Sequence, residues 1–135
     1  MSWNIVNDVE GEWPVVIEKL RPCFETGLVD FSEEDLQQWL RSRRMRLLVY
    51  HGEDEAYQMA CVFELVDYPA KRIFRVVMLA GDSRGQAFAE WESEVEEFVR
   101  MLGCSEIEAW CKDPQARLFR RWGLEKQCNI VRKEV

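Results

Sequence analysis

The chain has 135 residues, which suits a single domain over residues 1–135. Hydrophobic residues make up 47% and charged residues 32%, the balance of an ordinary soluble globular protein. The net charge of -7 disfavours a nucleic-acid-binding surface, which needs a basic excess, and no apolar run has the length of a membrane span. A solvated surface explains this charge, and an acidic surface that binds a basic partner is the alternative.

The cysteine pattern argues against a metal site. None of the five cysteines forms a CxxC pair, and the chain has one histidine, so no metal is expected. An odd count without a targeting segment indicates reduced thiols and a cytoplasmic location.

The first fifty residues predict a short strand, two helices and a second strand. Ser32 is a candidate N-cap, and the acidic residues after it complement the helix dipole. The predicted elements are a strand at 3–6, a helix from Glu12-Trp13-Pro14 to Gly27, a helix after Ser32 and a strand at 46–50.

A run of four arginines (Arg41, Arg43, Arg44 and Arg46) lies between the second helix and the second strand. Basic side chains at a helix C-terminus complement the helix dipole, which explains the run as solvated charge. A local contact with an anion is the alternative.

Alternating apolar residues predict an antiparallel meander over the middle of the chain. A polar turn at 51–55 separates the strand at 46–50 from one at 57–66, and a turn at 67–71 leads to a strand at 73–79. A glycine turn then joins this strand to a long amphipathic helix, whose expected buried face is Phe88, Trp91, Val95, Phe98, Val99 and Leu102.

The last third predicts a strand, a helix and a final strand. In the strand at 105–111, Ile107, Ala109 and Cys111 face one side, and Glu106, Glu108 and Trp110 face the other. Asp113 and Pro114 are typical of a helix start, and Gly123 of its end. Residues 127–133 can form the last strand.

The predicted order is therefore β-α-α-β-β-β-α-β-α-β. It corresponds to an α/β (α+β) domain with one mixed, mostly antiparallel sheet and helices on both faces. A right-handed crossover helix joins the meander to the next strand, which is parallel to its neighbour.

Six short motifs accompany this order: Trp13-Pro14, Asp67-Tyr68-Pro69, Leu79-Ala80-Gly81, Trp91, the segment from Gly103 to Ala109, and Gly123-Leu124. Together they resemble the GNAT N-acetyltransferase superfamily, and in particular the small GNAT-like proteins of tailed bacteriophages. The resemblance covers nearly the whole chain.

The resemblance implies that acetyl-CoA binds at the turn between the central strand and the long helix. Backbone N–H groups at a helix N-terminus favour an anion such as pyrophosphate; a glycine that only lets the chain turn is the other interpretation. The turn departs from the family's glycine spacing, and Asp82 places a negative charge there. The candidate cofactor-binding residues are Leu79, Gly81, Ser83, Arg84 and Gly85.

Proton transfer has less obvious candidates. Aligning the last helix on Gly123 puts Phe119 where active relatives have a tyrosine general acid, and Cys111 and Cys128 are possible substitutes. Glu64 and Asp67, at the end of the strand at 57–66, are the candidate catalytic bases. Glu108 and His51 are further candidates, and ordinary surface roles are the alternative for all of them.

Two functions follow from the resemblance. The first is an acetyl-CoA-dependent N-acetyltransferase that acts on an unknown amine. The second is a GNAT-fold phage protein that has lost the chemistry and acts as a virion component or by binding a host protein. A protein partner or homodimer fits either function, in the host cytoplasm or in the virion.

Overall fold

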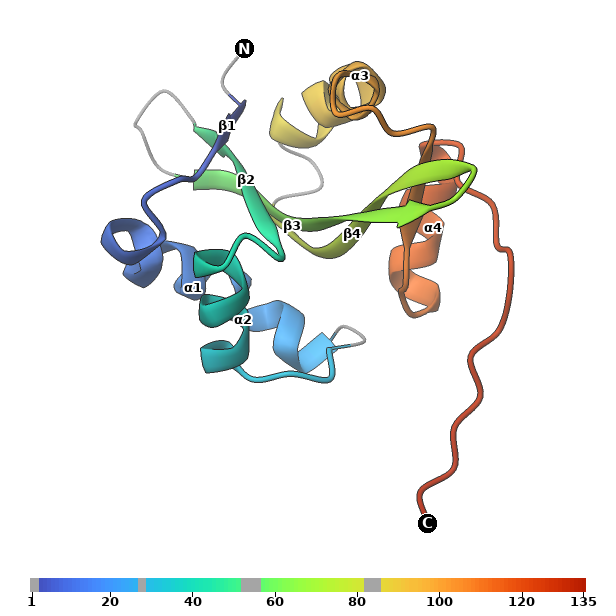
Figure 1. The fold of residues 1–135 in the computed structure, drawn as a ribbon, viewed down its shortest axis with the longest axis horizontal. Helices are drawn as coiled ribbons and strands as arrows, with labels where there is room; N and C mark the ends of the chain where they lie inside the picture. The colour runs from blue at the N-terminus through green and yellow to red at the C-terminus, as the bar shows by residue number, and fades with distance from the viewer. Residues whose placement is uncertain (1–2, 27–28, 52–56, 82–85) are drawn as a thin grey trace.

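The computed structural model describes residues 3–26, 29–51, 57–81 and 86–135. Within these ranges the chain forms one five-stranded sheet and four helices (Figure 1). The elements in chain order are β1 (Trp3–Ile5), α1 (Val9–Thr26), α2 (Glu33–Arg41), β2 (Arg46–His51), β3 (Tyr57–Tyr68), β4 (Lys71–Gly81), α3 (Gln86–Met101), β5 (Glu106–Ala109) and α4 (Asp113–Arg121).

The strands follow one another across the sheet in sequence order. β1 to β4 are antiparallel to their neighbours, and β5 is parallel to β4, to which α3 connects it. α1 and α2 cover one face of the sheet and α3 covers the other, as Figure 1 shows. This arrangement confirms the predicted mixed sheet with helices on both faces.

Each face of the sheet has its own hydrophobic core. The α3-side core joins β1–β4 to α3 and α4 through residues that include Trp3, Phe63, Phe74, Trp91, Val95 and Phe119. The α1-side core joins the sheet to α1 and α2 through residues that include Val16, Leu20, Leu36, Leu40, Val62 and Met78. Because both faces are buried, the central strands are nearly continuous runs of apolar residues.

The second helix begins as the sequence predicts. The Ser32 hydroxyl accepts a hydrogen bond from the Asp35 backbone N–H at 3.1 Å, and the Asp35 carboxylate accepts one from the Ser32 N–H at 3.0 Å. This reciprocal pair is a capping box, which satisfies two backbone donors at the start of α2.

Several predicted boundaries were wrong, and the strand predicted at 105–111 is shorter, ending at Ala109. α1 begins at Val9, because Asp8 accepts a hydrogen bond from the Gly11 N–H at 3.1 Å and so supports an earlier first turn. The turn predicted at 67–71 is shorter, because β3 and β4 stay paired out to Tyr68 and Lys71. Lys112, not Asp113, is the N-cap of α4, and its side chain makes no capping bond.

The strand predicted at 127–133 is also absent: residues 124–135 have no regular structure. A strand needs a neighbour to satisfy its backbone groups. The segment instead extends away from the sheet as an exposed tail (Figure 1), and Arg132 pairs with Asp30 at 2.8 Å. Strand propensity at Ile130 and Val131 therefore does not produce a strand, because the tail does not follow a sheet edge.

The last residue of β4 has no space for a side chain. A Cβ atom at Gly81 would lie 2.7 Å from the Gln58 carbonyl oxygen and 3.0 Å from a ring carbon of Phe88, and the Gly81 φ angle is 156°. Glycine is thus required where β4 leaves the sheet beneath α3.

Gly81→Ala should lower the free energy of unfolding by about 2–3 kcal/mol, because the added methyl group clashes and the backbone angle is unfavourable. Gly123→Ala is the matched control, since Gly123 also has a positive φ of 87° but open space around it. Urea unfolding measures both. An equal loss in the two variants would contradict the steric account.

Candidate functional site

The pairing of β4 with the edge strand β5 stops partway along β4. Their pairing runs only from Ile73 opposite Glu106 to Val76 opposite Ala109, whereas β4 continues to Gly81 with β3 alone. Among the described residues, no strand pairs with the outer edge of β4 over residues 77–81. We call this stretch the free edge of β4. Its backbone N–H and C=O groups are a template on which an extended ligand can pair.

An extra residue lies where this pairing stops. Val62 pairs with Met78 and Phe63 pairs with Val76, so Val77 is a β-bulge in β4. A bulge bends its strand and increases the local twist. It therefore turns β4 away from the line of β5 at the position where their pairing ends.

The C-terminal half of α1 adjoins the free edge of β4. The Cys23 thiol donates a hydrogen bond to the Leu79 carbonyl, with a sulfur–oxygen distance of 3.6 Å. Burial raises the pKa of Cys23, so the thiol keeps the proton that it donates. α1 thus forms one wall beside this edge.

Two of the five predicted cofactor-binding residues, Leu79 and Gly81, lie in the described part of the chain. Leu79 lies on the free edge and packs partly into the α3-side core, and Gly81 ends the strand. Ser83, Arg84 and Gly85 lie outside the described residues, as does the rest of the turn at 82–85.

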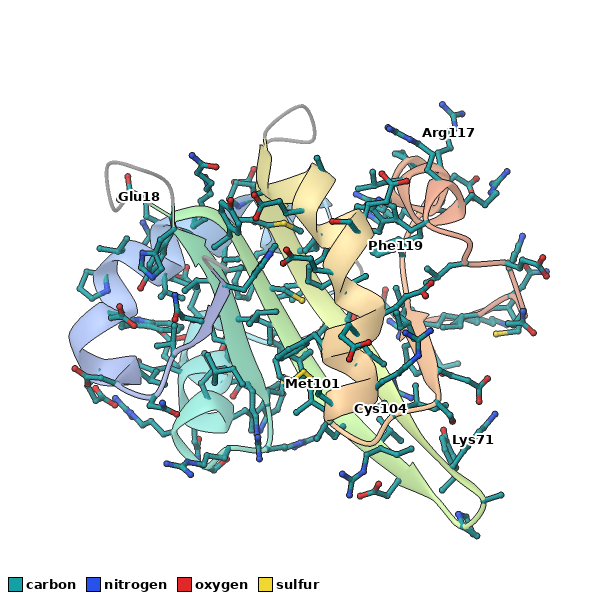
Figure 2. All side chains as sticks on the ribbon, turned by 90° about the horizontal axis from the view of Figure 1, so that it is seen from above. Glu18, Lys71, Met101, Cys104, Arg117 and Phe119 are labelled. Atoms are coloured by element: carbon teal, nitrogen blue, oxygen red, sulfur yellow. The ribbon has the colours of Figure 1, made fainter. Side chains whose placement is uncertain are left out.

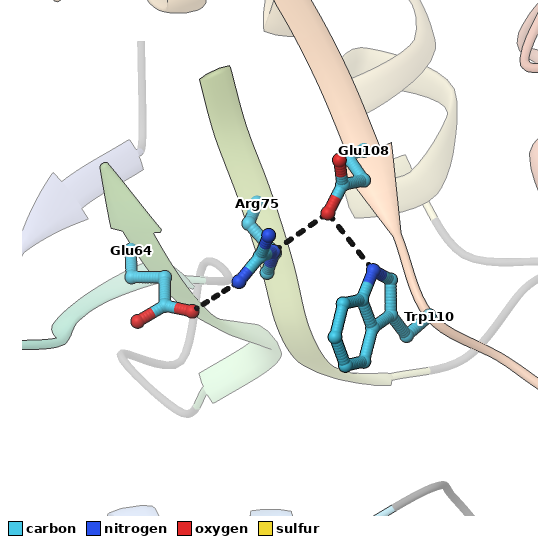
Figure 3. A network of polar contacts seen from close by, with 4 residues as sticks. All are labelled: Glu64, Arg75, Glu108 and Trp110. Atoms are coloured by element: carbon cyan, nitrogen blue, oxygen red, sulfur yellow. Dashed lines mark hydrogen bonds and ion pairs between the residues drawn. The ribbon is translucent and has the colours of Figure 1, made fainter. Parts of the chain in front are cut away.

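A polar network crosses the three strands next to this site. Glu64, Arg75 and Glu108 occupy neighbouring positions on β3, β4 and β5, so their side chains share one sheet face (Figure 3). Arg75 donates to Glu64 at 3.0 Å and to Glu108 at 2.7 Å. Trp110 donates its indole N–H to the same Glu108 oxygen at 2.9 Å.

This network holds its carboxylates in place. Burial opposes the charge on Arg75, but hydrogen bonds to Glu108 and Glu64 prevail and raise the pKa of the guanidinium. The guanidinium also lies 4.8 Å from the centre of the Trp110 ring, a cation–π contact. Trp110 is nevertheless 52% exposed, so it offers aromatic surface to a ligand.

The two predicted catalytic bases do not lie together. Glu64 belongs to the polar network, whereas Asp67 is three residues further along β3 and so faces the other side of the sheet. Asp67 pairs with Arg72 at 2.6 Å near the end of the hairpin. That position is about 17 Å from Val77 along β4, at 3.3 Å a residue.

The other candidates for proton transfer occupy separate places. Phe119 is buried between α4 and α3 (Figure 2), with its ring 5.6 Å from that of Trp122. Cys111 is partly buried, and burial raises the pKa of its thiol, as does nearby Asp113. Cys128 lies exposed on the tail.

Sequence reasoning missed a polar cluster at the same end of the sheet as Gly81. There, His51 makes an edge-on ring contact with Tyr57 at 4.9 Å. Burial, followed by a hydrogen bond with Glu12 of α1, raises the pKa of Tyr57. The only sequence signal was the position of Tyr57 at the start of a strand, directly after a polar turn.

No group of side chains suited to holding a metal ion occurs among the described residues. In the same part of the chain, no helix combines the length and apolar character needed to cross a membrane.

The whole fold superposes on several solved structures. No protein-family model matches the sequence, and no curated protein matches it. The structure of the BH1408 protein from Bacillus halodurans superposes with a TM-score of 0.71 at 13% identity, over 100% of both chains.

Two further solved structures are acetyltransferases. An aminoglycoside acetyltransferase from an uncultured soil metagenomic sample, in complex with sisomicin, has a TM-score of 0.71 at 16% identity, over 98% of this chain and 95% of its own. The glucosamine-6-phosphate N-acetyltransferase of Arabidopsis thaliana has a TM-score of 0.66 at 13% identity, over 99% of both chains.

The polar network gives a stability prediction. Arg75→Met should lower the free energy of unfolding by about 2 kcal/mol at pH 7, because it leaves two half-buried carboxylates unpaired. Arg100→Met is the matched control: Arg100 also pairs with two glutamates, Glu96 and Glu97, but all three side chains are exposed. Urea unfolding compares the variants. A similar loss in both would contradict a structural role for the network.

Arg75 and its partners lie next to the free edge of β4, and Cys23 of α1 contacts Leu79 on that stretch. Together with the superpositions, this geometry shows that the chain has the GNAT fold of N-acetyltransferases.

Proposed function

We propose that this protein is an acetyl-CoA-dependent N-acetyltransferase. The observation that carries the proposal is the free edge of β4, which begins at the Val77 bulge. The pantetheine arm of CoA is an extended chain with two amide groups. Amides of this kind pair with an open strand edge as another strand would.

The residues present fit such a donor at the free edge. Backbone groups over residues 77–81 would hold the arm, and the Gly81 backbone is bare of any side chain. Among the residues of the following turn, Ser83, Arg84 and Gly85 remain our proposed contacts to the phosphates, by analogy with anion sites at helix N-termini. When bound, acetyl-CoA supplies a thioester carbonyl that an amine nitrogen can attack.

The chain must also remove a proton from the acceptor, because an ammonium group has no lone pair for attack. Glu64 and Asp67 are the bases proposed from the sequence. The contact between Glu12 and Tyr57 adds a second candidate pair, at the end of the sheet where β4 finishes. These assignments differ in location, so single substitutions at Glu12, Glu64 and Asp67 separate them.

For the acceptor we propose an amine that is a cation in solution. Glu64, Glu108 and Arg75 give the polar network a formal charge of −1, and Trp110 beside it is half exposed, so the network favours a positively charged ligand. Two structural neighbours are named an aminoglycoside acetyltransferase and a glucosamine-6-phosphate N-acetyltransferase, which fits an amine acceptor.

A second candidate function is binding without catalysis. Phe119 has no proton to donate, and the cavity lined by Phe119, Trp91 and Trp122 measures only about 20 Å³, which is room for one water molecule. A GNAT-fold protein of this kind would act in the host cytoplasm or the virion of a phage, through a protein partner or as a homodimer.

Thermal unfolding with millimolar ligand tests the proposal. Acetyl-CoA and CoA should raise the melting temperature by several degrees, since a ligand at 100 times its Kd stabilises the folded state by about 2.7 kcal/mol. ATP is the control, because it carries adenosine and phosphates but no pantetheine arm.

The outcomes separate the two functions. A shift with acetyl-CoA and CoA alone supports the donor site at the free edge. An equal shift with ATP would assign the binding to the phosphates instead of the arm. No shift with any of the three would favour the binding protein, and a search for its partner would follow.

A further inference from the structure

A cavity beside the arginine run lies away from the free edge of β4. It has a volume of about 240 Å³ and is lined by the segment from β1 into α1, the end of α2 and the start of β2. Arg46 begins β2 here, whereas Gly81 pairs with Met59, and Met59 with Tyr50 near the far end of β2. The cavity and the free edge are thus at opposite ends of the sheet.

Three of the four arginines in the run after α2 line this cavity: Arg41, Arg43 and Arg46. Two carboxylates, Asp8 and Glu10, line it as well. The formal charge of the lining is therefore 3 − 2 = +1, in a chain whose net charge is -7. An anion is therefore locally favoured at this cavity.

The two carboxylates are already engaged. Arg41 makes a two-pronged ion pair with Glu10, and one of its contacts measures 3.0 Å. The hydrogen bond from Arg41 lowers the pKa of Glu10, so Glu10 stays ionised and the ion pair persists. Asp8 accepts the Gly11 N–H at 3.1 Å. In contrast, Arg43 and Arg46 are exposed, and no carboxylate among the described residues pairs with either.

The backbone of Arg43 adds an independent observation. Its φ angle is 62°, which makes it the only non-glycine residue with positive φ in the described chain. It stands one residue after the C-cap of α2, Ser42, a position that helices usually fill with glycine. Arginine here costs backbone strain that glycine would avoid, so folding does not explain why this residue is an arginine.

From these observations we propose that the cavity binds a phosphate group of a small molecule, through the guanidinium groups of Arg43 and Arg46. A guanidinium group presents a planar fork of donors that matches the oxygens of phosphate. The volume suits a phosphate with a small substituent. This site is separate from the donor site at the free edge, and it does not depend on acetyltransferase activity.

Isothermal titration calorimetry with inorganic pyrophosphate, in a chloride buffer of fixed ionic strength, tests the proposal on the full chain. The wild-type protein should bind one equivalent. Arg43→Gly and Arg46→Gln should each weaken binding by about tenfold, as expected for the loss of one charge-assisted contact. Arg44→Gln is the matched control, because Arg44 lies within the same run but stacks on Trp39 at 4.6 Å and does not line the cavity.

Arg43→Gly also separates binding from folding. This variant should raise the midpoint of urea unfolding, because glycine adopts the positive φ angle without strain. A more stable protein that binds pyrophosphate more weakly would support the proposal. Three results would overturn it: no binding by the wild type, equal weakening by Arg44→Gln, or citrate binding as tight as that of pyrophosphate.

Discussion

The pairing of β4 with its two neighbours is the constraint on which the rest of this structure depends. On one side β4 pairs with β3 from Lys71 to Gly81, interrupted only by the Val77 bulge. On the other side its pairing with β5 stops at Val76. Backbone polar groups must be satisfied wherever they are buried, so a strand that loses a neighbour leaves groups that water or a ligand must satisfy. The free edge of β4 is the direct consequence.

The two hydrophobic cores keep that edge in place. On the α3 side, the rings of Phe63 and Phe74 stack at 4.6 Å, and Phe98 of α3 packs edge-on against both at 6.1 Å. On the α1 side, Val62 and Met78 are buried beneath α1 and α2. β4 is thus fixed from both faces, while its outer edge over residues 77–81 pairs with no strand of the described chain. A ligand that pairs there meets backbone groups that are already oriented, which lowers the entropy lost on binding.

Much of the fold was predictable from periodicity and capping residues. The apolar face of α3 from Phe88 to Val99 is buried as expected, and Ser32 caps α2. The Val77 bulge and the shared face of Glu64, Arg75 and Glu108 were not predictable, because they depend on strand register, which one sequence does not specify. The expected strand at 127–133 fails for the same reason: propensity does not provide a pairing partner. The arginine run could be seen in the sequence, but only the fold shows that the start of α1 lies next to it and lines the same cavity.

Hydrogen exchange of the backbone amides, with and without saturating CoA, tests the central claim most directly. Ligand binding stabilises the whole fold and slows exchange throughout the sheet, but pairing of the donor arm with β4 should slow exchange at residues 77–81 by more than at β1 and β2. Such extra slowing at this segment would establish the free edge of β4 as the donor site. Slowing there no greater than at β1 and β2, at a CoA concentration that saturates binding, would contradict it.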